Sequence, residues 1–280
     1  MLGAGDIRRL MEAHGIGADR RLGQNFVTDP NIVRRIVSIA GVGPGSRVLE
    51  VGPGVGSLTL ALAESGAEVT AIEKDPSLLV VLDEVLAHAP AEHPPVVELG
   101  DALDVEWEPF LAARSDGHPA PWTVVANLPY NVAVPIIVGL LEGAPSVSSM
   151  FVMVQLEVAE RLCAQPGGRV IGVPTIRVGW HAEASIAMTV PPEVFTPRPR
   201  VRSAVVAMHR RPVPVEGVDE AAMFEIVGRA YRQRRKMLRS SLASAVPASA
   251  FDAAGVDPRS RPEELSVSDW GRLALELQRL

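Results

Sequence analysis

The stretch from Arg47 to Met208 alternates short apolar runs with segments of helical spacing, and this alternation restricts the possible folds of the 280-residue chain more than any other feature. Strands that alternate with helices are typical of an α/β domain with a largely parallel sheet. The runs are apolar on both faces, as expected where helices cover both sides of the sheet. The predicted strands are Arg47–Val51, Glu68–Ile72, Val96–Leu99, Thr123–Ala126 and Met150–Gln155, followed by closing antiparallel strands at Met188–Val190 and Ser203–Met208.

A glycine turn, Gly52-Pro-Gly54-Val-Gly56, separates the first of these strands from a helix predicted through Leu58–Ala63. Glycines at such a turn let the backbone come close to a ligand, and open α/β sheets bind nucleotides at the carboxyl ends of their strands. The third glycine follows the second after two residues rather than three, which disfavours a dinucleotide fingerprint, and the absence of Gly-Lys-Ser/Thr excludes a P-loop. A tight turn without a ligand is the alternative.

Two acids close the next two strands. Glu73 lies about 20 residues after the turn, where an acid typically binds ribose hydroxyls. Asp101 follows the third strand and is placed to accept a hydrogen bond from the exocyclic amine of an adenine. Either acid could instead cap a strand-to-helix turn. A glycine turn and two acids at successive strand ends outline a nucleoside ligand without phosphates, and S-adenosylmethionine fits this outline best.

The segment Asn127-Leu128-Pro129-Tyr130 follows the fourth strand, so it opens at the same edge of the sheet. An adenine N6 amine is a poor nucleophile because its lone pair is delocalised into the ring. The Asn127 side-chain oxygen and the Leu128 carbonyl can accept from its two N–H bonds and draw the nitrogen toward tetrahedral geometry. Pro129 fixes the backbone direction, and the Tyr130 ring offers a stacking face worth ~1–3 kcal/mol. The alternative is a turn with a packed tyrosine.

These motifs resemble the small-subunit (16S) ribosomal RNA adenine dimethyltransferases over almost the whole chain. The resemblance rests also on the segments 21–27, 155–162, 191–206 and 231–242. It implies that Asn25 and Val27 contact S-adenosylmethionine and that Phe195 faces the target base opposite Tyr130. The cofactor positions implied in this way are Asn25, Val27, Gly52, Gly54, Glu73, Asp101 and Asn127. The chain departs from the family at Ile171, where a tyrosine is frequent, and at Arg202, where an acid is usual.

Positive charge gathers in one part of an otherwise acidic chain. The net charge is −6, yet residues 198–239 hold eleven Arg and Lys against four Asp and Glu, which suggests a face that meets nucleic acid. A helix is predicted over Ala221–Leu242. At helical spacing Arg232, Arg235, Lys236 and Arg239 share one side of it, where they would contact RNA phosphates. The alternative is a charged face that only meets solvent. The segment 229–239, however, holds six cations and no acid, which favours a partner that neutralises them.

The segment 210–217 has linker composition, with two prolines, a glycine and no helical period. We therefore expect residues 1–211 to form an N-terminal helical extension plus a Rossmann-like methyltransferase domain that binds S-adenosylmethionine. Residues 212–280 are expected to form a small helical RNA-binding domain. No apolar stretch reaches the ~20 residues that a bilayer requires, and the histidines and single cysteine show no metal-ligand spacing. We expect no secretory signal. The expectation is a cytoplasmic monomer without a metal.

The predicted activity is dimethylation of the N6 amines of two adjacent adenosines in the 3′-terminal hairpin of 16S rRNA, within a pre-30S particle. Three alternatives remain open from the sequence. The first is a resistance methyltransferase acting on large-subunit rRNA, and the second is a non-catalytic RNA-binding assembly factor with the same fold. The third, a dinucleotide-dependent oxidoreductase, is disfavoured by the glycine spacing.

Overall fold

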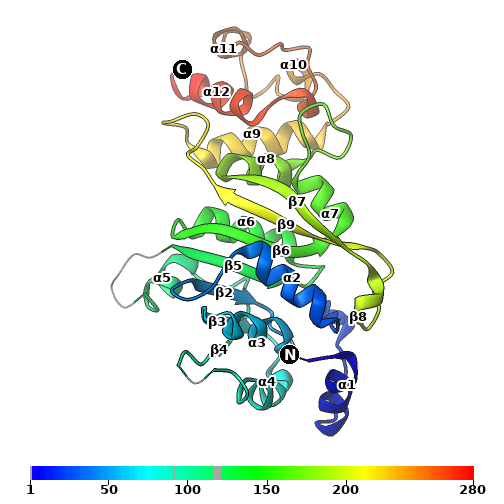
Figure 1. The fold of residues 1–280 in the computed structure, drawn as a ribbon. Coiled ribbons are helices and arrows are strands. Elements are labelled where there is room, and N and C mark those ends of the chain that lie inside the picture. Colours follow the sequence, from blue (N-terminus) through cyan, green and yellow to red (C-terminus); the bar gives the residue numbers. More distant parts are fainter. Residues whose placement is uncertain (1, 91, 116–120) are drawn as a thin grey trace. The chain divides into compact units, whose positions relative to one another are not determined.

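The computed structural model describes residues 2–90, 92–115 and 121–280 and divides into two compact units (Figure 1). The first unit contains the chain up to Ala159 together with Ser185–Arg210. The second contains Glu160–Ala184 and Arg211–Leu280. The C-terminal part of the second unit thus begins at Arg211, next to the expected boundary between residues 211 and 212, but the unit also takes in Glu160–Ala184, which the sequence analysis placed in the first domain.

The first unit is built on a seven-stranded sheet in the order β4-β3-β2-β5-β6-β9-β7. The β2–β3, β3–β4, β2–β5 and β5–β6 pairs are parallel, and β6 pairs with β9 in antiparallel register. This architecture confirms the predicted α/β class and each predicted strand. The strands are β2 (Arg47–Val51), β3 (Glu68–Glu73), β4 (Val96–Leu99), β5 (Trp122–Asn127), β6 (Val147–Gln155), β7 (Ala182–Val190) and β9 (Ser203–Arg210).

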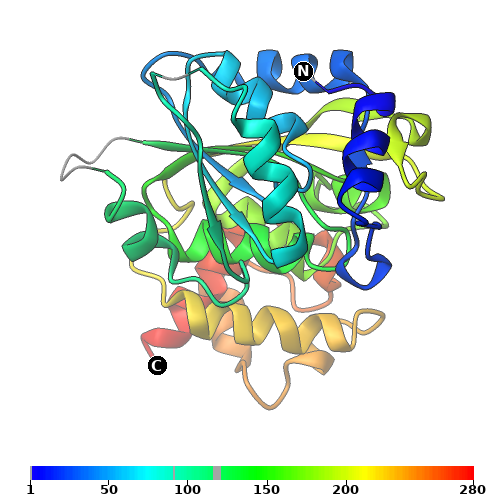
Figure 2. The ribbon, with the colours of Figure 1, turned by 90° about the horizontal axis from the view of Figure 1, so that it is seen from below.

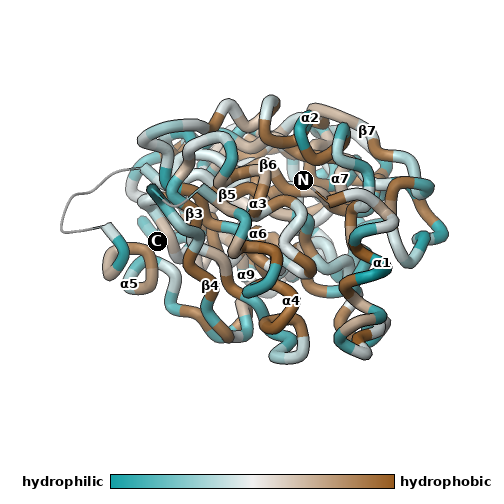
Figure 3. The backbone as a smooth tube through the Cα atoms, turned by 60° about the horizontal axis from the view of Figure 1, so that its bottom comes forward, coloured by the Kyte–Doolittle hydropathy of each residue, from teal (hydrophilic) through white to brown (hydrophobic). Residues whose placement is uncertain are grey.

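Alternate residues of the strands face opposite sides of the sheet, and both sides are buried. Val48, Val125 and Phe151 pack on one side with apolar residues of helices α2 (Pro30–Ala40) and α3 (Ser57–Glu64). The neighbouring residues Leu49 and Val124 face the other side and are equally buried. Figure 3 shows these central strands as mostly hydrophobic along their length. The other helices of this unit are α1 (Ala4–Ala13), α4 (Leu79–Leu86), α5 (Trp107–Ala112) and α6 (Ala133–Gly143), with α7 (Leu156–Leu162) at its boundary.

The strand order reverses between β2 and β5. From β2 the chain moves outward to β3 and β4, and it then returns to place β5 on the other side of β2. The carboxyl ends of β2 and β5 therefore lie side by side while the helices that follow them leave in different directions. Open α/β sheets form their ligand crevice at such a switch point.

A short strand in the N-terminal segment was not predicted from the sequence, which indicated only a helical extension. β1 (Phe26–Val27) pairs antiparallel with β8 (Phe195–Thr196), and the Thr28 N–H donates to the Val194 carbonyl over 2.8 Å. Figures 1 and 2 both show the N-terminal segment beside the segment around β8. The pairing fixes residues 26–28 next to the late part of the first unit.

The second unit is helical, as predicted, and has its own core around Trp180, Trp270 and Phe251. Its helices are α8 (Val173–His181), α9 (Glu220–Arg232), α10 (Leu238–Ser241), α11 (Ala248–Ala254) and α12 (Val267–Gln278). Ile171, one of the departures from the family, is buried in this core. In the described part of the chain no helix is long and apolar enough to cross a membrane.

The prediction of one helix over Ala221–Leu242 is wrong. α9 ends at Arg232, because Gln233 leaves the helical conformation (φ −120°, ψ 39°), and α10 begins only at Leu238. The charged residues 232–236 include no apolar side chain that could anchor another helical turn on the core. Leu238 and Leu242 are nevertheless fully buried, as their spacing indicated. Arg232 thus ends α9, Arg235 and Lys236 lie on the turn, and Arg239 lies in α10, so these cations do not share one side of a single helix.

Candidate active site

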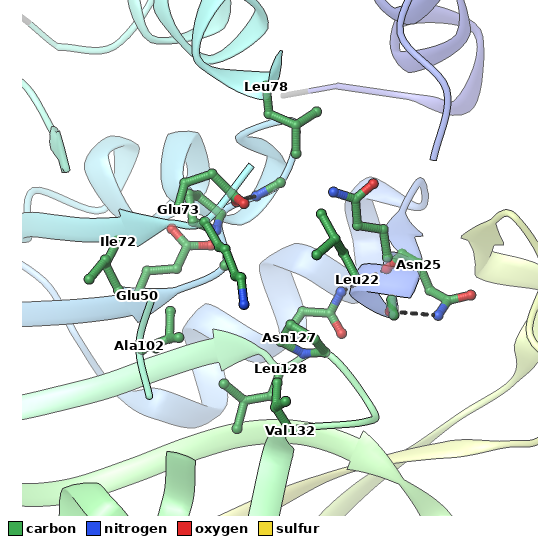
Figure 4. A pocket seen from close by; sticks show the side chains of 18 of the residues that line it. Leu22, Asn25, Glu50, Ile72, Glu73, Leu78, Ala102, Asn127, Leu128 and Val132 are labelled. Atoms are coloured by element: carbon green, nitrogen blue, oxygen red, sulfur yellow. Dashed lines mark hydrogen bonds between the residues drawn. The ribbon is translucent and has the colours of Figure 1, made fainter. Parts of the chain in front are cut away.

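A pocket opens at the carboxyl ends of β2, β3 and β5, at the switch point of the sheet. Figure 4 shows Glu50 and Glu73 together on one side of it and Asn25 on the opposite side, with Asn127 and Leu128 between them. The pocket brings together every site residue that the sequence indicated in the first unit except Phe195: Asn25, Val27, Gly52, Gly54, Glu73, Asp101, Asn127, Leu128, Pro129 and Tyr130.

Residues 19–27, which we call the strap, run across these strand ends. Gln24 Nε2 donates to Asp75 Oδ2 over 2.8 Å, which ties the strap to the end of β3. The Asn25 carbonyl accepts from Asn127 Nδ2 over 2.8 Å, and Asn131 Nδ2 donates to the Arg21 carbonyl over 3.2 Å. The strap therefore closes one wall of the pocket and holds the side chain of the residue that ends β5.

The Asn127 amide is oriented by the strap. Because its Nδ2 is committed to the Asn25 carbonyl, its Oδ1 is left as an acceptor, and this atom is buried without a hydrogen-bond partner among the described residues. A buried acceptor without a hydrogen bond costs about 1–3 kcal/mol of folding free energy. A ligand that donates a hydrogen bond to it removes this penalty and binds more tightly by a similar amount. The neighbouring Leu128 carbonyl likewise accepts no hydrogen bond within the described ranges, while the Leu128 N–H donates to Met153. Two free acceptors thus follow one another at the end of β5.

Tyr130 lines the pocket next to these acceptors, and its hydroxyl lies 2.7 Å from the Ser203 hydroxyl. Ser203 is fully buried at the start of β9. Burial raises the pKa of the Tyr130 hydroxyl, and the hydrogen bond with Ser203 lowers it by a smaller amount. The Tyr130 ring is thus neutral and fixed at its far end, which suits a stacking surface better than a general base.

Phe195 does not line this pocket. It is 3% exposed and packs in the apolar cluster that contains Val27, its cross-strand partner. Phe195 is therefore part of the β1–β8 pair, with its side chain in this apolar cluster and not among the residues that line the pocket.

Glu73 and Asp101 both line the pocket, but each already holds backbone groups. Glu73 accepts from the Gly54 N–H over 3.1 Å and from the Asp75 N–H over 2.9 Å. Burial raises the pKa of Glu73, and these two hydrogen bonds oppose that rise. Asp101 accepts from the Leu103 N–H and from Lys74 Nζ over 2.5 Å, and the Lys74 contact lowers its pKa. A ligand amine at Asp101 would compete with an exposed lysine.

Glu50 is a pocket residue that sequence reasoning missed. It lies inside the apolar strand β2, 1% exposed, and its Oε2 has no hydrogen-bond partner among the described residues. Burial, with a smaller contribution from the nearby Glu73 carboxylate, raises the pKa of Glu50 to about 8. A carboxyl residue within an otherwise apolar strand was the available signal. Ser57, whose buried hydroxyl is also unpaired within the described ranges, completes this side of the pocket.

The raised pKa of Glu50 predicts that the ligand-free protein loses stability as pH rises. A carboxyl whose pKa rises from 4.5 to about 8 on folding holds its proton more tightly in the folded chain, so its contribution is complete below pH 4.5 and is lost as pH approaches 8. Glu50→Gln should flatten this decline and be more stable than the parent at pH 8. Urea denaturation between pH 5 and about 8.5 checks the expectation. Glu12→Gln, the same substitution at an exposed position, serves as control. The expectation would be contradicted if the free energy of unfolding fell equally with pH in the parent and in Glu50→Gln.

The pocket fits S-adenosylmethionine on the evidence of its own atoms. Gly54 has φ +60°, and a Cβ there would lie 2.8 Å from the Phe26 ring, so the turn comes close to the strap in a way that only glycine allows. The unpaired acceptors of Glu50 and Asn127 offer polar partners to an ammonium group and to amines. Among the described residues no three His, Cys, Asp or Glu side chains are placed to hold a metal.

The basic turn of the second unit, residues 232–239, carries the four cations that the sequence singled out. Arg232, Arg235, Lys236 and Arg239 are exposed and make no side-chain hydrogen bond or ion pair with the described residues. Arg229 and Arg234, by contrast, are held by partners: Arg229 by Ser244 and Glu225, and Arg234 by the Arg169 carbonyl. Arg259 and, more weakly, Arg239 lower the pKa of the Asp257 carboxyl, so Arg239 interacts electrostatically with that group. All four cations are exposed and thus available to a polyanion.

The sheet and the pocket at its switch point are typical of a Rossmann-like methyltransferase that uses S-adenosylmethionine. The solved structure of the 23S rRNA methyltransferase ErmE is similar over 90% of this chain and 99% of that one, with 28% identity and a TM-score of 0.66. A dimethyladenosine transferase from Plasmodium falciparum, 21% identical, shares the fold over 91% of this chain and 98% of its own, with a TM-score of 0.74.

The family model for ribosomal RNA adenine dimethylase matches residues 17–279. The ribosomal RNA small subunit methyltransferase A of Thermobifida fusca is 46% identical over 98% of this chain and 95% of its own. The protein of that name from Kineococcus radiotolerans is 45% identical over 98% and 91%. The chain belongs to the ribosomal RNA adenine dimethylase family, and it is an S-adenosylmethionine-dependent methyltransferase.

Proposed function

We propose that this chain dimethylates the N6 amines of two adjacent adenosines in the 3′-terminal hairpin of 16S rRNA, acting as a cytoplasmic monomer on a pre-30S particle. The observation that carries the reaction is the pair of free acceptors, Asn127 Oδ1 and the Leu128 carbonyl, in the pocket beside Tyr130. The identity to relatives named for the small subunit supports the choice of 16S rRNA.

In this proposal the two acceptors bind the two N–H bonds of the target amine and localise its lone pair for attack. Pro129 fixes the direction of the Leu128 carbonyl, and the Tyr130 ring stacks on the base. Bound S-adenosylmethionine supplies an electrophilic methyl group at a sulfonium centre. Glu50, Glu73, Asp101 and the glycine turn would hold that cofactor, with Asn25 and Val27 from the strap. Catalysis then depends on positioning and on polarisation of the amine, and the proton leaves to solvent.

The reaction type is tested by the identity of the product. Small subunits that lack the modification are incubated with the protein and methyl-labelled S-adenosylmethionine, and the rRNA is digested to nucleosides for mass spectrometry. The proposal predicts N6,N6-dimethyladenosine as the end product. Monomethyladenosine alone, at excess enzyme, would contradict dimethylation, and no product would favour a non-catalytic assembly factor.

We also propose that the basic turn contacts RNA phosphates. Replacing Arg232, Arg235 and Arg239 together by glutamine should weaken binding of a fluorescent 16S rRNA fragment and reduce the salt slope by about 2–3, because each phosphate contact contributes roughly 0.7–0.9. Binding of S-adenosylmethionine should not change.

The matched control for this variant is the replacement of Arg229 and Arg234, whose guanidinium groups are held by partners within the second unit. That pair should change the salt slope much less. If the salt slope changed equally per substituted residue in both variants, the exposed cations of the basic turn would contribute no more to RNA binding than the two arginines held by partners.

A further inference from the structure

A second groove in the first unit adjoins the cofactor pocket. It is lined by Gly23, Gln24 and Asn25 of the strap and by residues 197–200, and the three strap residues also line the cofactor pocket. The groove therefore continues the site toward the surface along the segment that follows β8.

Residues 197–202, which we call the arginine arm, have the sequence Pro-Arg-Pro-Arg-Val-Arg. Pro197 and Pro199 are half-buried, whereas Arg198, Arg200 and Arg202 are exposed. The prolines restrict the backbone and have no N–H to donate, and the guanidinium groups are the charged donors that the arm offers. A segment with three cations and no acid suits an anionic partner.

The charges of Arg198 and Arg200, the two arginines that line the groove, are hardly neutralised by acids of the same chain. Arg200 makes no ion pair or hydrogen bond within the described ranges. Arg198 contacts Glu193, but both side chains are more than half exposed, and such solvated pairs contribute only about 0–1 kcal/mol. An incoming phosphate can thus take both guanidinium groups with little loss of existing contacts.

The arm is anchored close to the base-stacking residue. Phe195 and Thr196 are held by the β1–β8 pair, and Ser203, at the other end, holds the Tyr130 hydroxyl. Three residues span at most about 11 Å, so Arg200 lies within that reach of Ser203. An RNA strand whose base stacks on Tyr130 would therefore have its neighbouring phosphates within reach of the arm.

We infer that this groove binds phosphodiester groups of the RNA strand next to the target adenosine, with Arg198 and Arg200 as their ligands. The inference rests on the proposed function, since it places RNA at the same pocket. It gives the first unit an RNA contact of its own, in addition to the basic turn of the second unit. The arm would position the strand without reading its sequence, because phosphate contacts carry no base information.

The test uses a fluorescein-labelled oligoriboadenylate and an oligomer of the same length with a neutral methylphosphonate backbone. Arg198→Gln with Arg200→Gln should weaken binding of the charged oligomer about tenfold at low salt and reduce its salt slope by about 1.4, which corresponds to two contacts on a single strand. Binding of the neutral oligomer should not change. The same loss should appear in a chain that already carries the three substitutions in the basic turn, because the two sets of residues belong to different units. Arg35→Gln, an exposed arginine of α2, is the control.

Unchanged affinity for the charged oligomer would overturn the inference, as would an equal loss for the neutral one. Inorganic phosphate that displaces the oligomer at the same concentration of phosphate groups would also overturn it, since the groove would then be a site for small anions. Arg200→Gln alone keeps the test valid if the double variant fails to fold, because Arg200 has no partner to lose. Binding is measured without methyl transfer, so failure here is distinct from failure of the proposed reaction.

Discussion

Asn127→Ala is expected to slow methyl transfer by about 10²–10³-fold, the usual effect of removing one preorganised hydrogen-bonding group from an active site. The variant loses Oδ1, the buried acceptor that has no partner among the described residues, and with it one of the two hydrogen bonds proposed to hold the target amine. Cofactor binding should be retained to a large extent, because the other groups of the pocket are unchanged. Single-turnover methylation and calorimetric binding of S-adenosylmethionine separate the two effects.

The matched control is Asn31→Ala, the same substitution at an exposed position of α2. It should methylate at the native rate. If Asn127→Ala also methylates at that rate, the amine is not held by this amide and the proposed mechanism is wrong. If both the rate and cofactor affinity fall together, Asn127 acts mainly by holding the strap.

Gly54→Ala is expected to weaken S-adenosylmethionine binding about a hundredfold. The added Cβ would lie 2.8 and 2.9 Å from two atoms of the Phe26 ring, so the strap must move away from the glycine turn. Displacements of about 1 Å at a preorganised site are sufficient for losses of this size. The substitution also disturbs the hydrogen bond that the Gly54 N–H donates to the Glu73 carboxylate. Isothermal titration with the cofactor measures the effect.

Gly41→Ala separates backbone strain from the collision with Phe26. Gly41 has φ +63°, close to the +60° of Gly54, but a Cβ there would meet nothing within 4 Å. Both variants should lose about 1–2 kcal/mol of stability from the left-handed backbone, yet only Gly54→Ala should lose the cofactor. Native cofactor affinity in Gly54→Ala would show that the strap does not close this wall of the pocket.

Much of the cofactor pocket could be predicted because its residues follow local signals. Glu73 and Asn127 each end a buried apolar run, and parallel strands bring their carboxyl ends to one edge. The pocket accordingly contains almost every residue that the strand ends indicated. The acceptor role of Asp101, by contrast, meets a competing contact with Lys74 that sequence spacing does not show.

The parts that escaped prediction depend on contacts between distant segments. The pairing of Phe26 with Thr196 has no local signal, because each strand is only two residues long. The position of Phe195 in an apolar cluster follows from that pairing. The Asn127 amide is oriented by a backbone carbonyl of the strap, which no side-chain motif encodes.

The basic turn shows a different limit. Its charge was visible in the sequence, and the buried positions of Leu238 and Leu242 followed from their spacing. That spacing also fits a continuous helix, so the break at Gln233 was missed. The four cations that the sequence singled out are all exposed, and their role in RNA binding stays a prediction.

The most direct test of the proposed function maps the methylated nucleotides. Small ribosomal subunits from cells that lack this gene are incubated with the protein and methyl-labelled S-adenosylmethionine, with Asn127→Ala in parallel, and the RNA fragments are analysed by mass spectrometry. The proposal predicts dimethyladenosine at two adjacent positions near the 3′ end of 16S rRNA, and little or none with Asn127→Ala. Label on 23S rRNA instead, or on neither RNA, would contradict it.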